Sequence, residues 1–249
     1  MNEAEYRTMF EAEDRHWWYV ALHELILRFL EKEGQQKGRL RIFDAGCGTG
    51  RLCQLMAPHG EIEGCDMSES AILFCNSRGL GHLFRADLNT LGMGSERYDV
   101  VTSIDVLYHS AIRDDRLLVG KMFRALKPGG VLILQSPAYS FLRSRHDAAV
   151  HTRKRYVRGE ILRLLKEAGF TVETASYRIS FLFAPVALYR LITKFSGMRT
   201  GRQPRSDVST PPALINRLLL LLVRAEDRLV GSLGLPFGTS VFAVARKPL

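Results

Sequence analysis

The sequence predicts an α/β fold with a parallel, doubly wound sheet. Short apolar segments alternate with amphipathic ones up to about residue 177, a pattern typical of buried strands joined by helices. A glycine-rich turn at residues 46–50 follows the first apolar segment, and acidic residues follow the next two. Ligands of such sheets bind beyond the carboxyl ends of the strands, so the same features predict where a site lies.

The elements of the first half can be assigned in order along the chain. A helix is expected from about Glu11 to Lys32, because apolar side chains recur at helical spacing and Gly34 follows as a stop signal. Five apolar segments are expected to be strands: Arg39–Ala45, Glu61–Cys65, a short one around His82–Arg85, Tyr98–Ser103 and Val131–Gln135. The helices between them are expected to start near Arg51, at Ser68 and at Asp114, and the last one stops at Pro128-Gly129-Gly130.

The second half keeps this rhythm and then departs from it. A helix at Gly159–Ala168 and a strand at Phe170–Tyr177 continue the sheet, and Thr239–Ala245 is expected to be its last strand. The segment between these two strands holds an apolar stretch, a basic linker and a leucine-rich helix, at Ser180–Ile192, Lys194–Ser209 and Ala213–Val230. We therefore expect one domain, made of an N-terminal helical cap (1–38), a ligand-binding core (39–178), a helical insert (179–237) and a last strand (238–249).

Composition limits the classes of partner. The 249 residues are 46% hydrophobic and 24% charged, as in a folded protein, and the net charge of +9 attracts anionic surfaces. The four cysteines form no C-x-x-C pair and no histidine cluster accompanies them, so we predict no metal site and expect buried thiols in a reducing compartment. The polar N-terminus does not resemble a signal peptide, and no apolar run reaches the roughly 18 residues of a membrane span. A cytoplasmic protein is expected, with membrane association left open.

The segment Asp44-Ala45-Gly46-Cys47-Gly48-Thr49-Gly50 carries the strongest functional signal. Its glycines allow a tight turn after the first strand and a close approach of the backbone to a ligand. The spacing is G-x-G-x-G and lacks the third glycine of the dinucleotide fingerprint. Asp44 would repel a pyrophosphate but attract the sulfonium and amino groups of S-adenosylmethionine (SAM), so the pattern favours SAM over NAD.

Two further acids follow the next strands. Asp66 ends the second strand, where a carboxylate can accept both ribose hydroxyls of a nucleoside. Asp87 follows the third strand and could accept the adenine amino group. Each acid alone is more often a solvated turn residue, but three acids at successive strand ends beside a glycine loop favour a nucleoside site.

In these residues the sequence resembles the class I SAM-dependent methyltransferases. The family's successive motifs correspond to the glycine loop, Asp66, Ala86-Asp87-Leu88, Tyr98-Asp99-Val100-Val101 and Leu126-Lys127-Pro128-Gly129-Gly130. The resemblance implies a seven-stranded Rossmann-like sheet of order 3-2-1-4-5-7-6, with strand 7 antiparallel. It also implies the cofactor contacts: Gly46, Gly48 and Gly50 near the methionine part of SAM, Asp44 at its amino group, Asp66 at the ribose, Met67 against adenine, Asp87 and Leu88 at the adenine edge, and Ser103 and Ile104 beside the methyl donor.

The rest of the chain resembles one bacterial branch of that family, the type 11/12-like methyltransferases. The resemblance rests on the aromatic pair Trp17-Trp18 and on the segments His146–Tyr156 and Leu235–Ser240. Relatives often carry an arginine shortly after the aromatic pair, and a contact with the cofactor carboxylate is assigned to it. This chain has Val20-Ala21-Leu22-His23 there, so that arginine is missing. The pair is expected to anchor the N-terminal helix to the core, or else to make this helix a lid over the SAM pocket.

Methyl transfer is an in-line displacement, in which the protein aligns the acceptor and, for a hydroxyl or amine, removes a proton. The candidate catalytic residues are His109 after the fourth strand, and His151 and Tyr156 in the later basic segment, with Asp105 as a further candidate base. Tyr108, Arg153 and Arg155 are the candidate acceptor-binding residues, the arginines as an anion clamp. The alternatives are a structural hydrogen bond for His109 and a solvated cationic face for the basic segment.

The insert suggests what the acceptor is. Apolar residues such as Phe181, Phe183 and Leu188 precede basic ones at Lys194, Arg199, Arg202 and Arg205. The apolar residues of this insert either pack on the sheet, or they cover an acceptor pocket while the insert contacts a membrane surface. We expect a methyltransferase whose acceptor is small or lipid-like and hydrophobic, with or without an anionic group. The alternatives are an RNA or protein methyltransferase, favoured by the positive charge alone, and a SAM-binding protein without activity.

Overall fold

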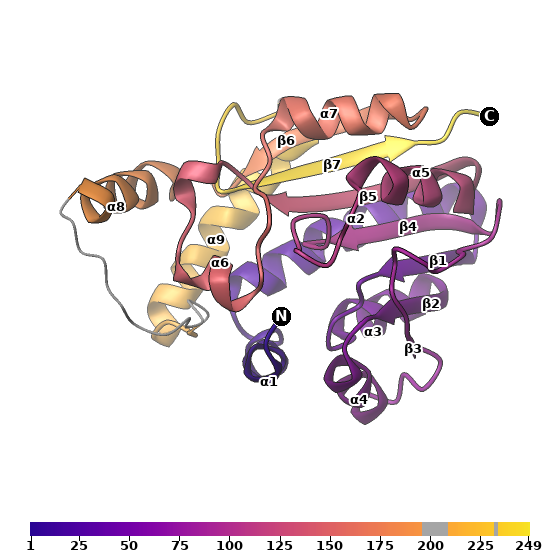
Figure 1. Cartoon of the computed structure of the whole chain (residues 1–249), viewed down its shortest axis with the longest axis horizontal. Coiled ribbons are helices and arrows are strands. Elements are labelled where there is room, and N and C mark those ends of the chain that lie inside the picture. The colour runs from indigo at the N-terminus through magenta and orange to yellow at the C-terminus, as the bar shows by residue number, and fades with distance from the viewer. Residues whose placement is uncertain (196–208, 232–233) are drawn as a thin grey trace.

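The computed structural model describes residues 1–195, 209–231 and 234–249, which form one seven-stranded sheet covered by helices on both faces (Figure 1). The strands are β1 (Leu40–Ala45), β2 (Gly60–Asp66), β3 (Phe84–Arg85), β4 (Tyr98–Ile104), β5 (Leu126–Pro137), β6 (Thr171–Arg178) and β7 (Ser240–Arg246). Their order is β3-β2-β1-β4-β5-β7-β6, and β7 runs antiparallel to both of its neighbours while the other pairs are parallel. The predicted fold class and strand order are confirmed.

Alternate residues of the central strands face two separate hydrophobic layers. The helices are α1 (Glu3–Ala12), α2 (Trp17–Lys37), α3 (Arg51–Met56), α4 (Glu69–Ser77), α5 (Asp115–Ala125), α6 (Arg145–Ala149), α7 (Arg158–Glu167), α8 (Phe183–Phe195) and α9 (Ala213–Val230), with short 3-10 turns at Ala57–His59 and Ser140–Leu142. In β5, Leu132 and Leu134 join a cluster with α5 and α7, whereas Val131 and Ile133 join a cluster with α2 and α3. Because side chains alternate across a strand, both faces of β5 must be apolar, which explains its continuous apolar sequence.

The N-terminal region differs from the single predicted helix. The chain forms α1 and α2 with a short break between them, because the His16 side chain accepts a hydrogen bond from the Trp18 N–H (3.3 Å) and caps the start of α2. Gly34 lies inside α2, which continues to Lys37 and ends at Gly38, where φ is 76°. The predicted start and end of this helix are both wrong. The observed boundaries of α2 are set by the capping side chain of His16 and by Gly38 with its positive φ, and not by apolar periodicity.

The insert forms α8 and α9, which are held differently. α9 packs along α2 and β6, and its Asp227 accepts hydrogen bonds of 2.8 and 2.7 Å from the Arg178 side chain of β6. Both side chains are buried, so this ion pair fixes α9 on the sheet. α8 extends to one side of the molecule and contacts the turn at Ser140–Leu142 (Figure 1). Most of the predicted basic linker, including Arg199, Arg202 and Arg205, lies outside the described residues.

Candidate active site

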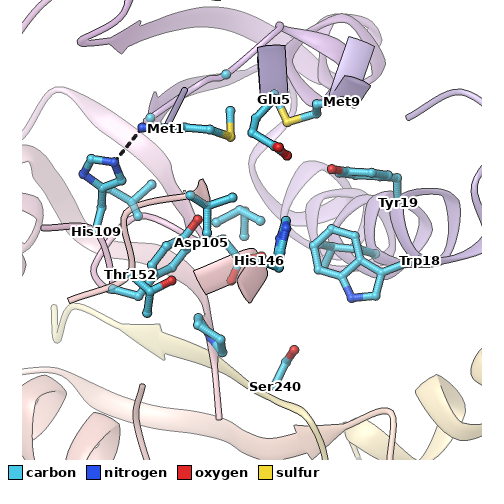
Figure 2. A pocket seen from close by; sticks show the side chains of 18 of the residues that line it. Met1, Glu5, Met9, Trp18, Tyr19, Asp105, His109, His146, Thr152 and Ser240 are labelled. Atoms are coloured by element: carbon cyan, nitrogen blue, oxygen red, sulfur yellow. Dashed lines mark hydrogen bonds between the residues drawn. The ribbon is translucent and has the colours of Figure 1, made fainter. Parts of the chain in front are cut away.

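A cavity of about 510 Å³ opens at the carboxyl ends of the strands (Figure 2). It extends from the glycine loop after β1, past the end of β4, to the start of β7 and to α8. Figure 2 shows Glu5 and Met9 of α1, Trp18 and Tyr19 of α2, and Asp105 after β4 around this space. The volume is typical of a small-molecule site, and the location is where open α/β sheets bind ligands.

The glycine loop has a backbone conformation that glycine adopts most easily. Gly46 and Gly48 line the cavity with φ values of 89° and 54°. A Cβ atom on Gly46 would lie 2.4 Å from the Cγ2 atom of Val106, so no larger residue fits there without a shift. Gly50 (φ 83°) instead precedes α3 as its cap and does not line the cavity.

Asp66 holds the glycine loop and faces the cavity at the same time. Its Oδ2 accepts a hydrogen bond from the Gly48 N–H (3.1 Å), and its Oδ1 accepts one from the Ser68 N–H (2.9 Å). The Tyr6 hydroxyl of α1 also donates to Oδ1 (3.0 Å), and burial together with the Asp66 charge raises the pKa of this tyrosine. Met67, the next residue, lines the cavity with its side chain partly exposed. The carboxylate is thus oriented for hydroxyl donors.

Asp44 is almost completely withdrawn from solvent, yet it borders the cavity. Its Oδ1 accepts a hydrogen bond from the Thr102 hydroxyl (2.7 Å), and its Oδ2 accepts one from the Cys53 thiol (3.2 Å). Burial raises the pKa of Asp44 to about 6, against the opposing effect of these hydrogen bonds. A desolvated carboxylate with neutral partners is stabilised by any cation that binds beside it.

The remaining predicted cofactor residues divide into two groups. Asp87, Leu88 and Ile104 line the cavity, and Asp87 Oδ1 accepts hydrogen bonds from both the backbone and the side chain of Asn89 (2.9 and 2.6 Å). Ser103 is fully buried and does not line the cavity. Because side chains alternate along β4, only one of the last two strand residues can face this side of the sheet.

Two of the predicted acceptor-side residues, Tyr108 and His109, border the cavity. His109 Nδ1 accepts a hydrogen bond from the Ala111 N–H (3.0 Å), and the amino group of Met1 lies 2.8 Å from Nε2. The pKa of His109 is lowered to about 4, mainly by burial and then by the charges of that amino group and of His151. His109 is therefore neutral near pH 7 and a weak base.

The basic segment is engaged mainly in contacts within the protein. Tyr156 is fully buried, and its hydroxyl lies within hydrogen-bonding distance of two acceptors, Asp115 Oδ2 (2.8 Å) and the Leu107 carbonyl (3.1 Å). Arg153 pairs with the same carboxylate. His151 is exposed, with Nε2 2.8 Å from the Asn2 side chain. The structure therefore does not bring these three predicted residues to the cavity.

Arg155 does line the cavity, but its guanidinium donates to three oxygens of two residues in the protein. Nε and Nη2 donate to the two carboxylate oxygens of Asp147 (2.8 and 3.0 Å), and Nη1 donates to the Ala138 carbonyl (3.0 Å). The nearby Asp147 neutralises its charge, so an anion at this point would meet an ion pair rather than a lone cation.

Several lining residues were not predicted from the sequence. Tyr6 and Met9 lie on one face of α1, and the Met9 methyl group lies 2.8 Å from the position that a Cβ on Gly48 would take. Glu5 is a buried carboxyl on the same helix. The spacing of Tyr6 and Met9 fits one helical face, but it begins before the predicted helix does and its apolar signal is short.

The cavity has two ends of different chemistry. The acidic end carries Asp44, Asp66 and Asp87 and suits amino and hydroxyl donors, whereas the other end is lined by apolar side chains such as Trp18 and Leu182. Within residues 1–195, 209–231 and 234–249, no group of three or more His, Cys, Asp or Glu side chains could hold a metal ion.

Comparison with known proteins gives matches over the core. Residues 36–180 match a family model described as a methyltransferase domain. The ubiquinone biosynthesis O-methyltransferase of Coxiella burnetii (strain Dugway 5J108-111) is 28% identical over 134 residues, covering 48% of this chain and 56% of that protein. The protein of the same name from Chelativorans sp. (strain BNC1) is 36% identical over 101 residues, covering 38% and 39%. The chain thus spans about half the length, or less, of these curated relatives.

A solved structure extends the likeness to nearly the whole chain. The S-adenosylmethionine-dependent methyltransferase from Mesorhizobium loti superposes with a TM-score of 0.58 at 18% identity, covering 94% of this chain and 100% of that one. At this identity the similarity shows a shared fold.

Proposed function

The chain belongs to the class I SAM-dependent methyltransferase family, and from this membership we propose that it transfers a methyl group from SAM to a small, lipid-like hydrophobic acceptor. The observation that carries the proposal is one continuous cavity with an acidic end and an apolar end. SAM is the family's cofactor and supplies an electrophilic methyl group. The residues of this chain have to hold SAM, orient the acceptor and exclude water.

The acidic end fits the polar groups of SAM. We assign the ribose hydroxyls to Asp66 and the amino group to Asp44, whose desolvated carboxylate gains from a cation. Met67, Asp87 and Leu88 are assigned to adenine, as an apolar surface and a hydrogen-bond acceptor at its edge. Gly46 and Gly48 give the backbone room beside the methionine part, and Ile104 borders the methyl group.

Arg51 is our candidate for the carboxylate of SAM. It follows the glycine loop directly and lines the cavity, with Nε 2.6 Å from Asp14 Oδ1 and Nη1 donating to Gln54 (2.6 Å). His23 lines the same region, but burial lowers its pKa to about 4, so this histidine carries no charge near pH 7. Arg51, although it pairs with Asp14, is thus the arginine that we assign in place of the one missing after the aromatic pair.

The apolar end supports a hydrophobic acceptor. It is lined by Trp17, Trp18, Leu142, Ile179, Leu182 and Val186, from α2, the turn before α6 and the insert. The curated relatives are named ubiquinone biosynthesis O-methyltransferases, and this name supports oxygen as the acceptor atom. We assign Tyr108, His109 and Arg155 to the acceptor side, since they border the cavity beyond β4.

Calorimetric titration of the purified chain with SAM and with S-adenosylhomocysteine tests the first step. Micromolar binding of both supports the proposal, and incubation with methyl-labelled SAM and a membrane lipid extract should then yield an organic-soluble labelled product. A folded protein that binds neither compound would contradict it. Label incorporated into RNA or protein instead would favour the alternative acceptor class.

We further propose that α8 and α9 rest on an anionic membrane surface while the acceptor is taken up. Among the described residues no helix is long and apolar enough to cross a membrane, but large apolar side chains are exposed on both helices: Leu188, Tyr189, Leu191 and Ile192 on α8, and Leu214, Ile215, Leu218, Leu221 and Leu222 on α9. Leu182 and Val186 line the cavity from the start of α8, next to this exposed surface. The net charge of +9 and the basic residues that the sequence places between the two helices suit anionic lipid.

A double substitution, Leu218→Glu with Leu221→Glu, should weaken binding to vesicles of phosphatidylcholine with phosphatidylglycerol by tenfold or more, because two apolar side chains leave the interface and two negative charges enter it. Vesicle flotation measures this. Leu73→Glu, at an exposed leucine of α4, is the matched control and should leave binding unchanged. Equal flotation of all three proteins would rule out α9 as the contact.

A further inference from the structure

Asp105 occupies the midpoint of the cavity. It directly follows β4, the middle strand of the sheet, with the cofactor-side strands β1 and β2 on one side and β5 and β7 on the other. Figure 2 shows its side chain in the centre of the cavity lining. Its φ of 54° is a left-handed conformation that a non-glycine residue rarely adopts and that often occurs at functional sites. The Asp105 N–H donates to the Gln135 carbonyl (2.9 Å), which holds this turn on β5.

A chain of buried polar side chains leads from α9 to the Asp105 carboxylate. Asp227 of α9 accepts two hydrogen bonds from Arg178 of β6, and Arg178 Nη1 donates to Gln135 Oε1 (2.8 Å). Gln135 Nε2 in turn donates to Asp105 Oδ2 (3.1 Å). Gln135, Arg178 and Asp227 are all buried. The mechanism proposed above uses none of these three residues.

The chemistry of arginine fixes the direction of every bond in this chain. A guanidinium can only donate, so the Gln135 oxygen has to face Arg178 and its amide nitrogen has to face Asp105. Asp105 Oδ2 is therefore held as an acceptor. Within the part of the chain that the structure describes, Oδ1 receives no hydrogen bond from the protein, and it is the oxygen left for a ligand.

We propose that Asp105 is the general base that takes the proton of the acceptor hydroxyl, and that Gln135, Arg178 and Asp227 are positioning residues that orient its carboxylate. This inference rests on the proposed methyltransferase function and deepens it. In the step, the acceptor O–H bond breaks and its proton moves to Asp105 Oδ1 while the acceptor oxygen bonds to the methyl carbon. The electron pair of the broken carbon–sulfur bond stays on sulfur, and Asp105 afterwards releases its proton to water.

Two titratable groups assigned to the acceptor side, His109 and Tyr108, are less suited to this step. His109 is a weak base, and burial raises the pKa of Tyr108 far above its ordinary value. Burial raises the pKa of Asp105 to about 6, despite the Gln135 hydrogen bond and the charges of Arg178 and Arg155. Burial and then the charge of Asp105 raise the pKa of Tyr108, and burial followed by the charges of Glu13 and Asp105 raises that of Tyr19. A base with a pKa near 6 is ionised at neutral pH and close to the range in which proton transfer is efficient.

Asp105→Asn, an isosteric change, should lower kcat a hundredfold or more for methyl transfer to the probe 4-tert-butylcatechol, with SAM affinity unchanged. The matched control is Asp99→Asn, which alters a carboxylate at the opposite end of β4 and should leave kcat as in the wild type. Wild-type kcat in Asp105→Asn would overturn the assignment of the base. Absence of methyl transfer by the wild-type protein would instead count against the proposed acceptor class.

A carboxyl titration by 13C NMR without cofactor tests the inference independently of activity. The wild type should show two aspartate carboxyls that titrate near pH 6, those of Asp44 and Asp105, and only one of them should be missing from Asp105→Asn. Gln135→Glu keeps an acceptor for Arg178 but turns a second carboxylate toward Asp105, so the titration of Asp105 and the acid limb of the kcat profile should both move up by at least one pH unit. Unmoved values in Gln135→Glu would overturn the positioning role. If Asp105→Asn removed no carboxyl that titrates near pH 6 in the wild type, the inference for Asp105 would be overturned.

Discussion

Asp66→Ala should reduce SAM affinity by about a hundredfold or more. Hydrogen bonds to a charged group contribute about 1.5–3 kcal/mol each, and roughly 1.4 kcal/mol corresponds to a tenfold change in affinity. Loss of the proposed ribose contacts alone therefore accounts for two orders of magnitude. The same substitution removes the acceptor of the Gly48 and Ser68 N–H groups, at 3.1 and 2.9 Å, so the glycine loop also loses its support.

Calorimetry with SAM measures this effect, and circular dichroism shows whether the variant remains folded. Glu61→Ala is a suitable control because it removes an exposed carboxylate from the same strand without contact to the cavity. SAM affinity within threefold of the wild type in a folded Asp66→Ala protein would contradict the ribose assignment.

Asp227→Ala should lower the free energy of unfolding by about 3–5 kcal/mol, because it leaves the buried Arg178 without its counter-ion. For a domain of this size each kcal/mol shifts Tm by roughly 2–4 °C, so a decrease of about 6–20 °C is expected. Arg224→Ala, on the same helix, breaks the pair of Arg224 with Glu24 of α2. Both side chains of this pair are over 40% exposed, so the change should cost about 1 kcal/mol or less.

The double variant Arg178→Met with Asp227→Leu separates charge from packing. If the loss in Asp227→Ala comes from the unpaired arginine, replacing both partners by apolar side chains should recover most of the stability. Differential scanning calorimetry of the four proteins makes the comparison. A double variant that is no more stable than Asp227→Ala would show that the pair contributes through its shape and not through its charges.

The core could be predicted because its signals are local. The glycine loop, Asp44 and Asp66 are a few residues from a strand end, and the edge of the sheet on which they meet follows from the parallel fold itself. The local sequence was therefore enough to predict that Asp44, Asp66 and Asp87 line the cavity.

Whether residues of the later basic segment line the cavity could not be predicted in this way, because partners elsewhere in the chain decide their contacts. Arg153 and Tyr156 contact Asp115, about 40 residues earlier, whereas Arg155 pairs with Asp147 of α6, eight residues earlier. A charged side chain that finds such a partner is drawn toward it and away from a ligand. The break before α2 depends on local capping by His16, and the contact of Tyr6 with Asp66 depends on tertiary packing. Apolar periodicity reveals neither of them.

The ion pair between α9 and β6 ties the evolution of the insert to that of the core. Segments that connect the strands of a sheet tolerate more variation than the strands themselves, and they often carry binding residues. Here, exchanging α9 for an unrelated helix would leave the buried Arg178 without its counter-ion. Arg178 is linked to Asp105 by only two hydrogen bonds, through Gln135. A grafted insert would therefore have to bring its own carboxylate to the position of Asp227, or the recipient core would have to give up Arg178. Helix α9 and strand β6 are thus expected to be inherited together, as one unit of descent.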